Sequence, residues 1–157
     1  MSIVSVSVPD FLEGTEEESL YVKQCVDILE KGKDLLLVSS ASIDRDEIEK
    51  SMEAGKKKQM TLPEISEYTQ ELMGNIANQV LEQVKVSGVF LTGGDTSIGF
   101  LKQAEAEGSF ILSEIATGIP LMQIEGGKYD KMKVVTKAGA FGKEDAILFG
   151  LRKLKEK

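Results

Sequence analysis

Residues 88–97 read Gly-Val-Phe-Leu-Thr-Gly-Gly-Asp-Thr-Ser, a pattern that predicts a strand, a tight turn and the start of a helix. The apolar run 89–91 is typical of a buried strand, and Gly93 and Gly94 suit a tight turn after it. Residues 95–97 are of the types that cap helices, and apolar residues then recur at helical spacing. The stretch therefore predicts one strand–turn–helix unit.

Such a unit is a possible anion site. The first N–H groups of a helix have no partner within the helix, and the helix dipole places its positive end there. A glycine turn lets these N–H groups approach phosphate closely. The alternative is an ordinary strand-to-helix turn without a ligand, and this stretch alone favours neither interpretation.

Composition limits the class of protein. The length of 157 residues predicts one domain, residues 1–157. The chain has 19 Lys and Arg against 26 Asp and Glu, a net charge of −7, which argues against a nucleic-acid partner. No apolar run approaches the ~20 residues of a membrane span, so no membrane association is expected. With one cysteine, Cys25, no disulfide can form within the chain, and we expect a cytoplasmic protein.

The chain contains no histidine. Ser-His-Asp catalysis, Cys-His catalysis and histidine metal sites are therefore excluded. Any chemistry must use carboxylates, hydroxyls, lysine, backbone N–H groups or a metal held by oxygen.

Strand patterns alternate with helix patterns along the chain. The predicted strands cover residues 3–8, 35–38, 89–91, 109–112, 121–124 and 132–137. This alternation predicts an α/β layered fold with a mainly parallel sheet and flanking helices. Capping boxes at Thr15/Glu18 and Thr61/Glu64 predict two helix starts, residues 43–60 predict an exposed, partly helical segment, and a last helix is expected from about Glu144.

Three predicted strands end in small, polar or glycine-rich residues, at 39–40, 92–96 and 136–139. Ligands of parallel α/β sheets bind outside the carboxyl ends of the strands. If the three strands are parallel, their ends meet at one crevice. This convergence favours a binding site over an ordinary turn.

Three motifs resemble a known family. They are Leu-Thr-Gly-Gly-Asp-Thr at 91–96, Glu-Ile-Ala-Thr-Gly-Ile-Pro-Leu at 114–121, and Val-Val-Thr-Lys-Ala-Gly-Ala-Phe-Gly at 134–142. In this order they resemble the C-terminal nucleotide-binding domain of the four-carbon acid sugar kinases. That family phosphorylates threonate-like, erythronate-like or 3-oxo-tetronate-like acids with ATP. The resemblance is clearest from about Asp34 to the end of the chain.

The resemblance implies a set of nucleotide-binding residues: Gly93, Gly94, Asp95, Thr96, Lys137, Gly139 and Gly142. The glycines would let the backbone approach phosphate, and a positive φ at Gly94 would make any side chain there strained as well. Asp95 would either cap the helix or hold Mg²⁺ through water. Lys137 would either neutralise phosphate charge or have a structural role. Glu114 belongs to the second motif, but the sequence assigns it no role.

The family's enzymes also contain an N-terminal domain that holds the acid-sugar site, and this chain shows no counterpart of it. The resemblance therefore implies an ATP-binding kinase half, with Mg²⁺ accompanying the nucleotide, that is inactive without an acid-sugar-binding domain in cis or on a separate chain. One alternative is a non-catalytic module that binds nucleotide or phosphate. Another is a small enzyme that uses the same crevice for a different phosphorylated or carboxylated ligand.

Overall fold

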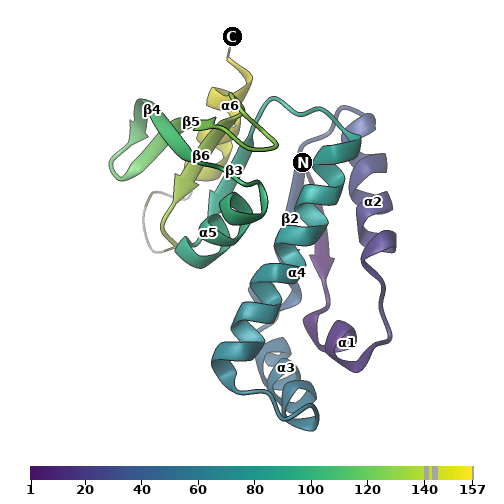
Figure 1. Ribbon diagram of the computed structural model, residues 1–157. Helices are drawn as coiled ribbons and strands as arrows, with labels where there is room; N and C mark the ends of the chain where they lie inside the picture. Colours follow the sequence, from purple (N-terminus) through teal and green to yellow (C-terminus); the bar gives the residue numbers. More distant parts are fainter. Residues whose placement is uncertain (140–141, 143–144, 157) are drawn as a thin grey trace. The chain divides into compact units, whose positions relative to one another are not determined.

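The computed structural model describes residues 1–139, 142 and 145–156 (Figure 1). The chain divides into two compact units, Met1–Val84 and Lys85–Lys157. Each unit has its own sheet, so each is described by itself.

The first unit holds a two-stranded parallel sheet. Its elements are β1 (Ser2–Val6), α1 (Val8–Glu13), α2 (Glu18–Glu30), β2 (Leu35–Ser39), the 3₁₀ turn η1 (Ser40–Ser42), α3 (Asp46–Lys57) and α4 (Leu62–Gln83). β1 and β2 run parallel, from Ser2 opposite Leu35 to Val6 opposite Ser39. The parallel pairing agrees with the sequence prediction for this part of the chain.

One hydrophobic core joins this sheet to α2 and α4. Val6, Cys25 and Ile76 have no exposed surface. Along β1 buried valines alternate with exposed residues, as expected for a strand with one covered face. Fully burying an aliphatic side chain of this size stabilises the fold by about 1.5–3 kcal/mol, so this core holds the first unit together.

The strand predicted at residues 3–8 ends earlier than expected. β1 ends at Val6, and Val8 already begins α1. Pro9 lies in the first turn of α1, where its missing N–H does no harm. Gly14 then ends the helix with a φ of 77°. Alternation alone could not separate the end of the strand from the first turn of a short helix.

Of the two predicted capping boxes, one is wrong and one is confirmed. The N–H and Oγ1 of Thr15 donate to the carbonyl of Asp10, at 2.9 and 3.1 Å, while α2 begins only at Glu18. At the start of α4, the N–H and Oγ1 of Thr61 both donate to Oε2 of Glu64, each at 2.7 Å. The polar segment 43–60 contains α3, which buries Ala54 and Gly55 on one face.

The confirmed capping box predicts a pH-dependent stability. Hydrogen bonds from the Thr61 backbone N–H and hydroxyl lower the pKa of Glu64 below its usual 4.5. A carboxylate whose pKa is lower in the folded state stabilises the fold above its unfolded pKa, and loses this effect as the pH falls through the folded value. Glu64→Ala should therefore destabilise the chain near neutral pH and approach parent stability in acid, as measured by urea unfolding across a pH series.

Glu67→Ala is the matched control, because Glu67 is an exposed glutamate of the same helix. Glu67→Ala leaves the capping box of α4 intact, so it should cause no cap-related loss of stability at any pH. A Glu64→Ala deficit that stays constant from neutral to acidic pH would show that the cap does not act through the carboxylate charge.

The second unit is built on a four-stranded sheet. Its elements are β3 (Val89–Thr92), α5 (Gly94–Gln103), β4 (Gly108–Ala116), β5 (Ile119–Glu125), β6 (Lys133–Lys137) and α6 (Ala146–Lys155). The strand order is β3-β6-β5-β4. β3 and β6 are parallel, whereas β5 is antiparallel to both β6 and β4.

The α/β class is confirmed, but this larger sheet is mixed rather than mainly parallel. β4 and β5 are joined by a turn at Thr117 and Gly118, where Gly118 has a φ of 73°. Strands joined by so short a connection must be antiparallel, because a parallel pair needs a long crossover. The strand predicted at residues 121–124 begins earlier than expected, because Ile119 and Pro120 already belong to β5.

α6 packs against one face of this sheet. Val135, Ile119 and Leu154 are almost completely buried in the shared core. Gly150 lies so close to the ring of Phe90 that a side chain there would collide with it. Helix α6 starts at Ala146; its predicted start, Glu144, lies outside the described residues.

Candidate functional site

The loops after β3 and β6 leave the same edge of the sheet. The two strands are parallel neighbours, and Thr92 lies opposite Lys137 at their carboxyl ends. The N–H of Gly93 donates to the carbonyl of Lys137 at 3.0 Å, which ties the two loops together. The third predicted strand end, residues 39–40, lies at the end of β2, which belongs to the other sheet. The larger sheet thus brings together two of the three predicted strand ends.

Gly93 forms the turn between β3 and α5. It is the N-cap residue of α5 and has a φ of 92°, a conformation that strongly favours glycine. Its carbonyl accepts hydrogen bonds from the N–H of Ser97 at 3.0 Å and from Ser97 Oγ at 2.8 Å. Ser97 is buried, so this pair of bonds fixes the turn. The sequence interpretation missed that role, although a hydroxyl residue four positions after the glycine was its signal.

Of the two roles considered for Asp95, the helix cap is not found, because the N-cap position belongs to Gly93. Asp95 and Thr96 lie in the first turn of the helix and are exposed. Asp95 therefore places a carboxylate beside the helix start without satisfying its N–H groups. Those groups are left to solvent or to a ligand.

Gly94 begins α5 and faces open space. A Cβ built on Gly94 meets no atom within 4 Å, and the same holds for Gly139 in the loop after β6. The positive φ considered for Gly94 is found at Gly93 instead. A side chain at Gly94 would thus enter open space without straining the backbone.

Lys137 is the last residue of β6. Its Nζ donates to the carbonyls of Ala138 at 3.0 Å and Gly139 at 2.8 Å, so the ammonium group lies against its own loop. Gly142 has a φ of 90°, and a Cβ built there would lie 3.4 Å from Lys137 Cε and 2.9 Å from Ile119 Cδ1. The structure therefore brings Lys137, Gly139 and Gly142 together.

Glu114 has a structural contact that the sequence did not reveal. Its Oε1 accepts a hydrogen bond from the N–H of Gly118 at 2.9 Å, four residues further along. This bond closes the turn between β4 and β5. The second resembling motif, residues 114–121, thus includes the tip of that hairpin.

Residues 1–139, 142 and 145–156 contain no group of three or more Cys, Asp or Glu side chains arranged to hold a metal ion. Among the helices of those same residues, none combines the length and apolarity needed to cross a bilayer.

Comparison with known proteins identifies the family. Residues 1–147 match the family described as the nucleotide-binding C-terminal domain. The chain belongs to this family. The match confirms the resemblance drawn from the three sequence motifs, and it covers the first unit and most of the second.

The curated relatives of this nucleotide-binding domain are kinases. The chain is 29% identical to the D-threonate kinase of Salmonella typhimurium over 146 residues, which are 92% of this chain and 34% of that enzyme. It is 32% identical to the D-threonate kinase of Bordetella bronchiseptica over 85 residues, 54% of this chain and 21% of that enzyme. The chain thus spans about a third or less of the length of these relatives.

Solved structures show the same fold. A domain of unknown function from Bordetella bronchiseptica, described with bound citrate as a domain-swapped dimer, superposes with a TM-score of 0.67 at 21% identity, over 99% of this chain and 35% of that one. A protein from Haemophilus influenzae superposes with a TM-score of 0.69 at 19% identity, over 97% of this chain and 34% of that one. At these identities the likeness concerns the fold alone.

Proposed function

We propose that this chain supplies the ATP site of a four-carbon acid sugar kinase, with the ATP phosphates at the start of α5. The observation that carries the proposal is the open, exposed backbone at Gly94, next to the strand end that bears Lys137. Helix N-termini that follow a glycine turn bind phosphate through backbone N–H groups and the helix dipole. Membership of the nucleotide-binding family and the D-threonate kinase relatives support the same ligand.

Within this site the residues have different roles. The N–H groups of Gly94, Asp95 and Thr96 would hold phosphate oxygens. Open space at Gly139 would let a second stretch of backbone approach the nucleotide. Lys137 would exchange its two carbonyl acceptors for a phosphate oxygen and neutralise part of the charge.

Mg²⁺ would arrive with the nucleotide. It is commonly held by substrate phosphates, waters and one or two carboxylates rather than by a cage of protein ligands. Asp95 is exposed in the first turn of α5 and offers one carboxylate there, through water. The ion would reduce the repulsion between that carboxylate and the phosphates.

We further propose that residues 1–157 act as one cytoplasmic nucleotide-binding domain and need an acid-sugar-binding domain, in cis or on another chain. Phosphoryl transfer requires donor and acceptor to be held in line, and the proposed site accounts for the donor alone. An assay of the chain with ATP and four-carbon acids should therefore show no turnover. The second candidate function is a non-catalytic nucleotide-binding module, which would use the same ATP site. The two functions are distinguished by adding an acid-sugar-binding domain, because a non-catalytic module would then still show no kinase activity.

Calorimetric titration with Mg-ATP at low and high salt tests the proposed site. The parent chain should bind Mg-ATP, and Lys137→Ala should bind it about tenfold more weakly at low salt. One charge-assisted hydrogen bond contributes roughly 1.5–3 kcal/mol. Part of this gain is offset, because Lys137 must give up its hydrogen bonds to the two loop carbonyls. The deficit should shrink at high salt, since exposed charges are screened.

Lys102→Ala is the matched control, because Lys102 is an exposed lysine in the last turn of α5, away from the helix start. It should bind Mg-ATP like the parent at both salt concentrations. An equal loss of Mg-ATP affinity in both variants would show that the effect comes from the net charge of the chain and not from the position of Lys137. A parent chain that gives no binding heat would refute the proposed ATP site.

A further inference from the structure

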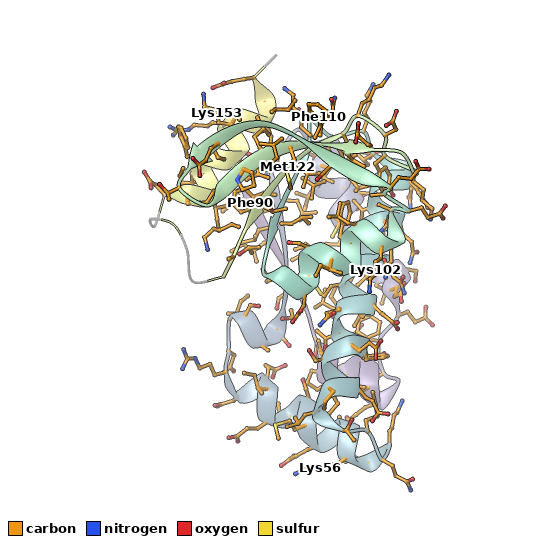
Figure 2. All side chains as sticks on the ribbon, turned by 60° about the vertical axis from the view of Figure 1, so that its left-hand side comes forward. Lys56, Phe90, Lys102, Phe110, Met122 and Lys153 are labelled. Carbon is orange, nitrogen blue, oxygen red and sulfur yellow. The ribbon has the colours of Figure 1, made fainter. Side chains whose placement is uncertain are left out.

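The peptide bond between Gly93 and Gly94 is held in one orientation at the start of α5. β3, which carries Phe90, leads through this peptide into α5, which carries Lys102 in its last turn (Figure 2). The carbonyl of Gly93 accepts two hydrogen bonds, from the N–H of Ser97 at 3.0 Å and from Ser97 Oγ at 2.8 Å. Ser97 is only 9% exposed, so water competes little for these bonds.

The orientation of this carbonyl determines where the next N–H group points. A peptide bond is planar, and in its trans form the C=O and the N–H point in opposite directions. The described residues contain no cis peptide bond. Because the Gly93 carbonyl points into α5, toward Ser97, the N–H of Gly94 points out of the helix start. This N–H is the first of the groups at which we place the ATP phosphates.

Two adjacent glycines make this peptide easy to reverse. Reversing it changes only the ψ of Gly93 and the φ of Gly94, and glycine tolerates either sign of φ. A reversed peptide would direct the Gly93 carbonyl oxygen outward, where its partial negative charge would repel phosphate. The N–H of Ser97 belongs to the regular hydrogen-bond pattern of a helix, so the Ser97 hydroxyl is the additional group that selects one orientation.

The peptide on the other side of Gly93 is fixed separately. The N–H of Gly93 donates to the carbonyl of Lys137 at 3.0 Å, which holds this peptide against the end of β6. The restraint by Ser97 therefore acts on the peptide that follows Gly93, and this is the peptide that carries the Gly94 N–H.

We propose that Ser97 is a positioning residue of the ATP site, whose hydroxyl holds the Gly93–Gly94 peptide with its N–H directed at phosphate. This inference rests on the function proposed above, because it concerns the same nucleotide. Ser97 would act through the Gly93 carbonyl without contacting the ligand. Apparent affinity falls with the fraction of chains in the binding-competent conformation, so a chain whose peptide reverses part of the time binds ATP more weakly.

Calorimetric titration with Mg-ATP tests the role of the hydroxyl. Ser97→Ala should bind Mg-ATP about fivefold to tenfold more weakly, because one neutral hydrogen bond shifts such an equilibrium by about that factor. Ser97→Thr keeps a hydroxyl that can bond to the carbonyl four residues earlier, so it should restore most of the affinity. A folded Ser97→Ala that binds Mg-ATP like the parent would overturn the proposal, and so would an equal loss in Ser97→Ala and Ser97→Thr.

Ser51→Ala is the matched control. Ser51 is also buried, at 7% exposed, and its Oγ donates to the carbonyl of Glu47, four residues earlier, at 2.7 Å. It lies on α3, in the first unit. Ser51→Ala removes the same kind of hydrogen bond and should leave Mg-ATP affinity unchanged. A loss of affinity equal to that of Ser97→Ala would show that binding follows stability in general, and would overturn the assignment to Ser97.

The carbonyl carbon of Gly93 provides a second readout, in the absence of nucleotide. Its NMR resonance responds to the hydrogen bonds that the oxygen accepts, so it should shift in Ser97→Ala and stay near the parent position in Ser97→Thr. An unchanged resonance in Ser97→Ala would show that the hydroxyl does not hold this peptide. A parent chain that binds no Mg-ATP refutes the proposed ATP site, whereas a parent chain that binds it as well as Ser97→Ala does refutes the inference about Ser97 alone.

Discussion

Gly94→Val should weaken Mg-ATP binding by about a hundredfold, equivalent to roughly 2.7 kcal/mol, while the second unit stays folded. The valine would occupy the open space before the first turn of α5, where we place the phosphates. It would keep oxygen atoms away from the backbone N–H groups that would hold them. Calorimetric titration of the variant and the parent under the same conditions measures this loss.

The stability of Gly94→Val separates a binding defect from a folding defect. Gly94 lies within α5 and lacks a positive φ, so valine needs no unusual backbone there. Glycine is the poorer helix former by a few tenths of a kcal/mol, so the free energy of unfolding should stay within about 1 kcal/mol of the parent. Ile98→Ala changes an exposed side chain of the same helix and should leave ATP binding intact. A folded Gly94→Val that binds Mg-ATP like the parent would show that the turn holds no phosphate.

Gly127→Ala should destabilise the second unit by about 3 kcal/mol or more. A Cβ built on Gly127 would collide with the carbonyl oxygens of Ala104 and Glu105, and would lie 2.6 Å from the carbonyl carbon of Glu105. These are backbone atoms, and the N–H of Lys128 donates to the same Ala104 carbonyl at 2.9 Å, which holds the two segments together. The φ of 72° at Gly127 adds strain for any other residue. Urea unfolding followed by amide signals of the second unit measures the loss.

Gly14→Ala separates conformational strain from steric collision. Gly14 has a similar φ of 77°, but a Cβ built there meets no atom within 4 Å. Gly14→Ala should therefore lower the free energy of unfolding by only about 1 kcal/mol, the cost of the left-handed backbone conformation. Equal losses in Gly14→Ala and Gly127→Ala would contradict the close approach of residues 104–105 to the turn at Gly127.

Local patterns predicted the strand–turn–helix unit at which we propose the phosphate site. The apolar run at 89–91, the two glycines and the following helical spacing correspond to β3, the turn and α5. The capping box at Thr61 was also predictable, because it depends on residues three positions apart. At Thr15 the same pattern failed, since the N–H and the hydroxyl of Thr15 both donate to the backbone carbonyl of Asp10. Local rules hold only where no competing backbone group is within reach.

The mixed sheet could not be predicted from strand patterns alone. Residues 109–112 and 121–124 have the composition of strands in either direction, and their antiparallel pairing depends on where the turn lies. The exposure of Phe110 on an edge strand depends on the strand order, which no local pattern gives. For the same reason the sequence expected three strand ends at one crevice, whereas the larger sheet joins only those of β3 and β6.

The candidate site was predictable as a set of residues but not as a geometry. The motifs named Gly93 and Gly94 together, but the structure gives them separate roles in the turn and at the helix start. Gly93 has the positive φ, and the two hydrogen bonds of Ser97 hold its carbonyl; the motif alone gives neither feature. The hydrogen bonds of Lys137 to its own loop could not be read from the sequence either.

Backbone amide NMR of the chain titrated with Mg-ATP is the most direct test of the proposed phosphate site. Amide N–H groups that hold phosphate shift strongly when the anion binds, so the largest changes should fall on Gly94, Asp95 and Thr96, with smaller ones near Gly139. Residues of α2, which belong to the other unit, serve as the internal reference. Saturable shifts centred on the start of α5 are the predicted result. Saturable shifts centred elsewhere, or none at all, would contradict the assignment of the nucleotide to this turn.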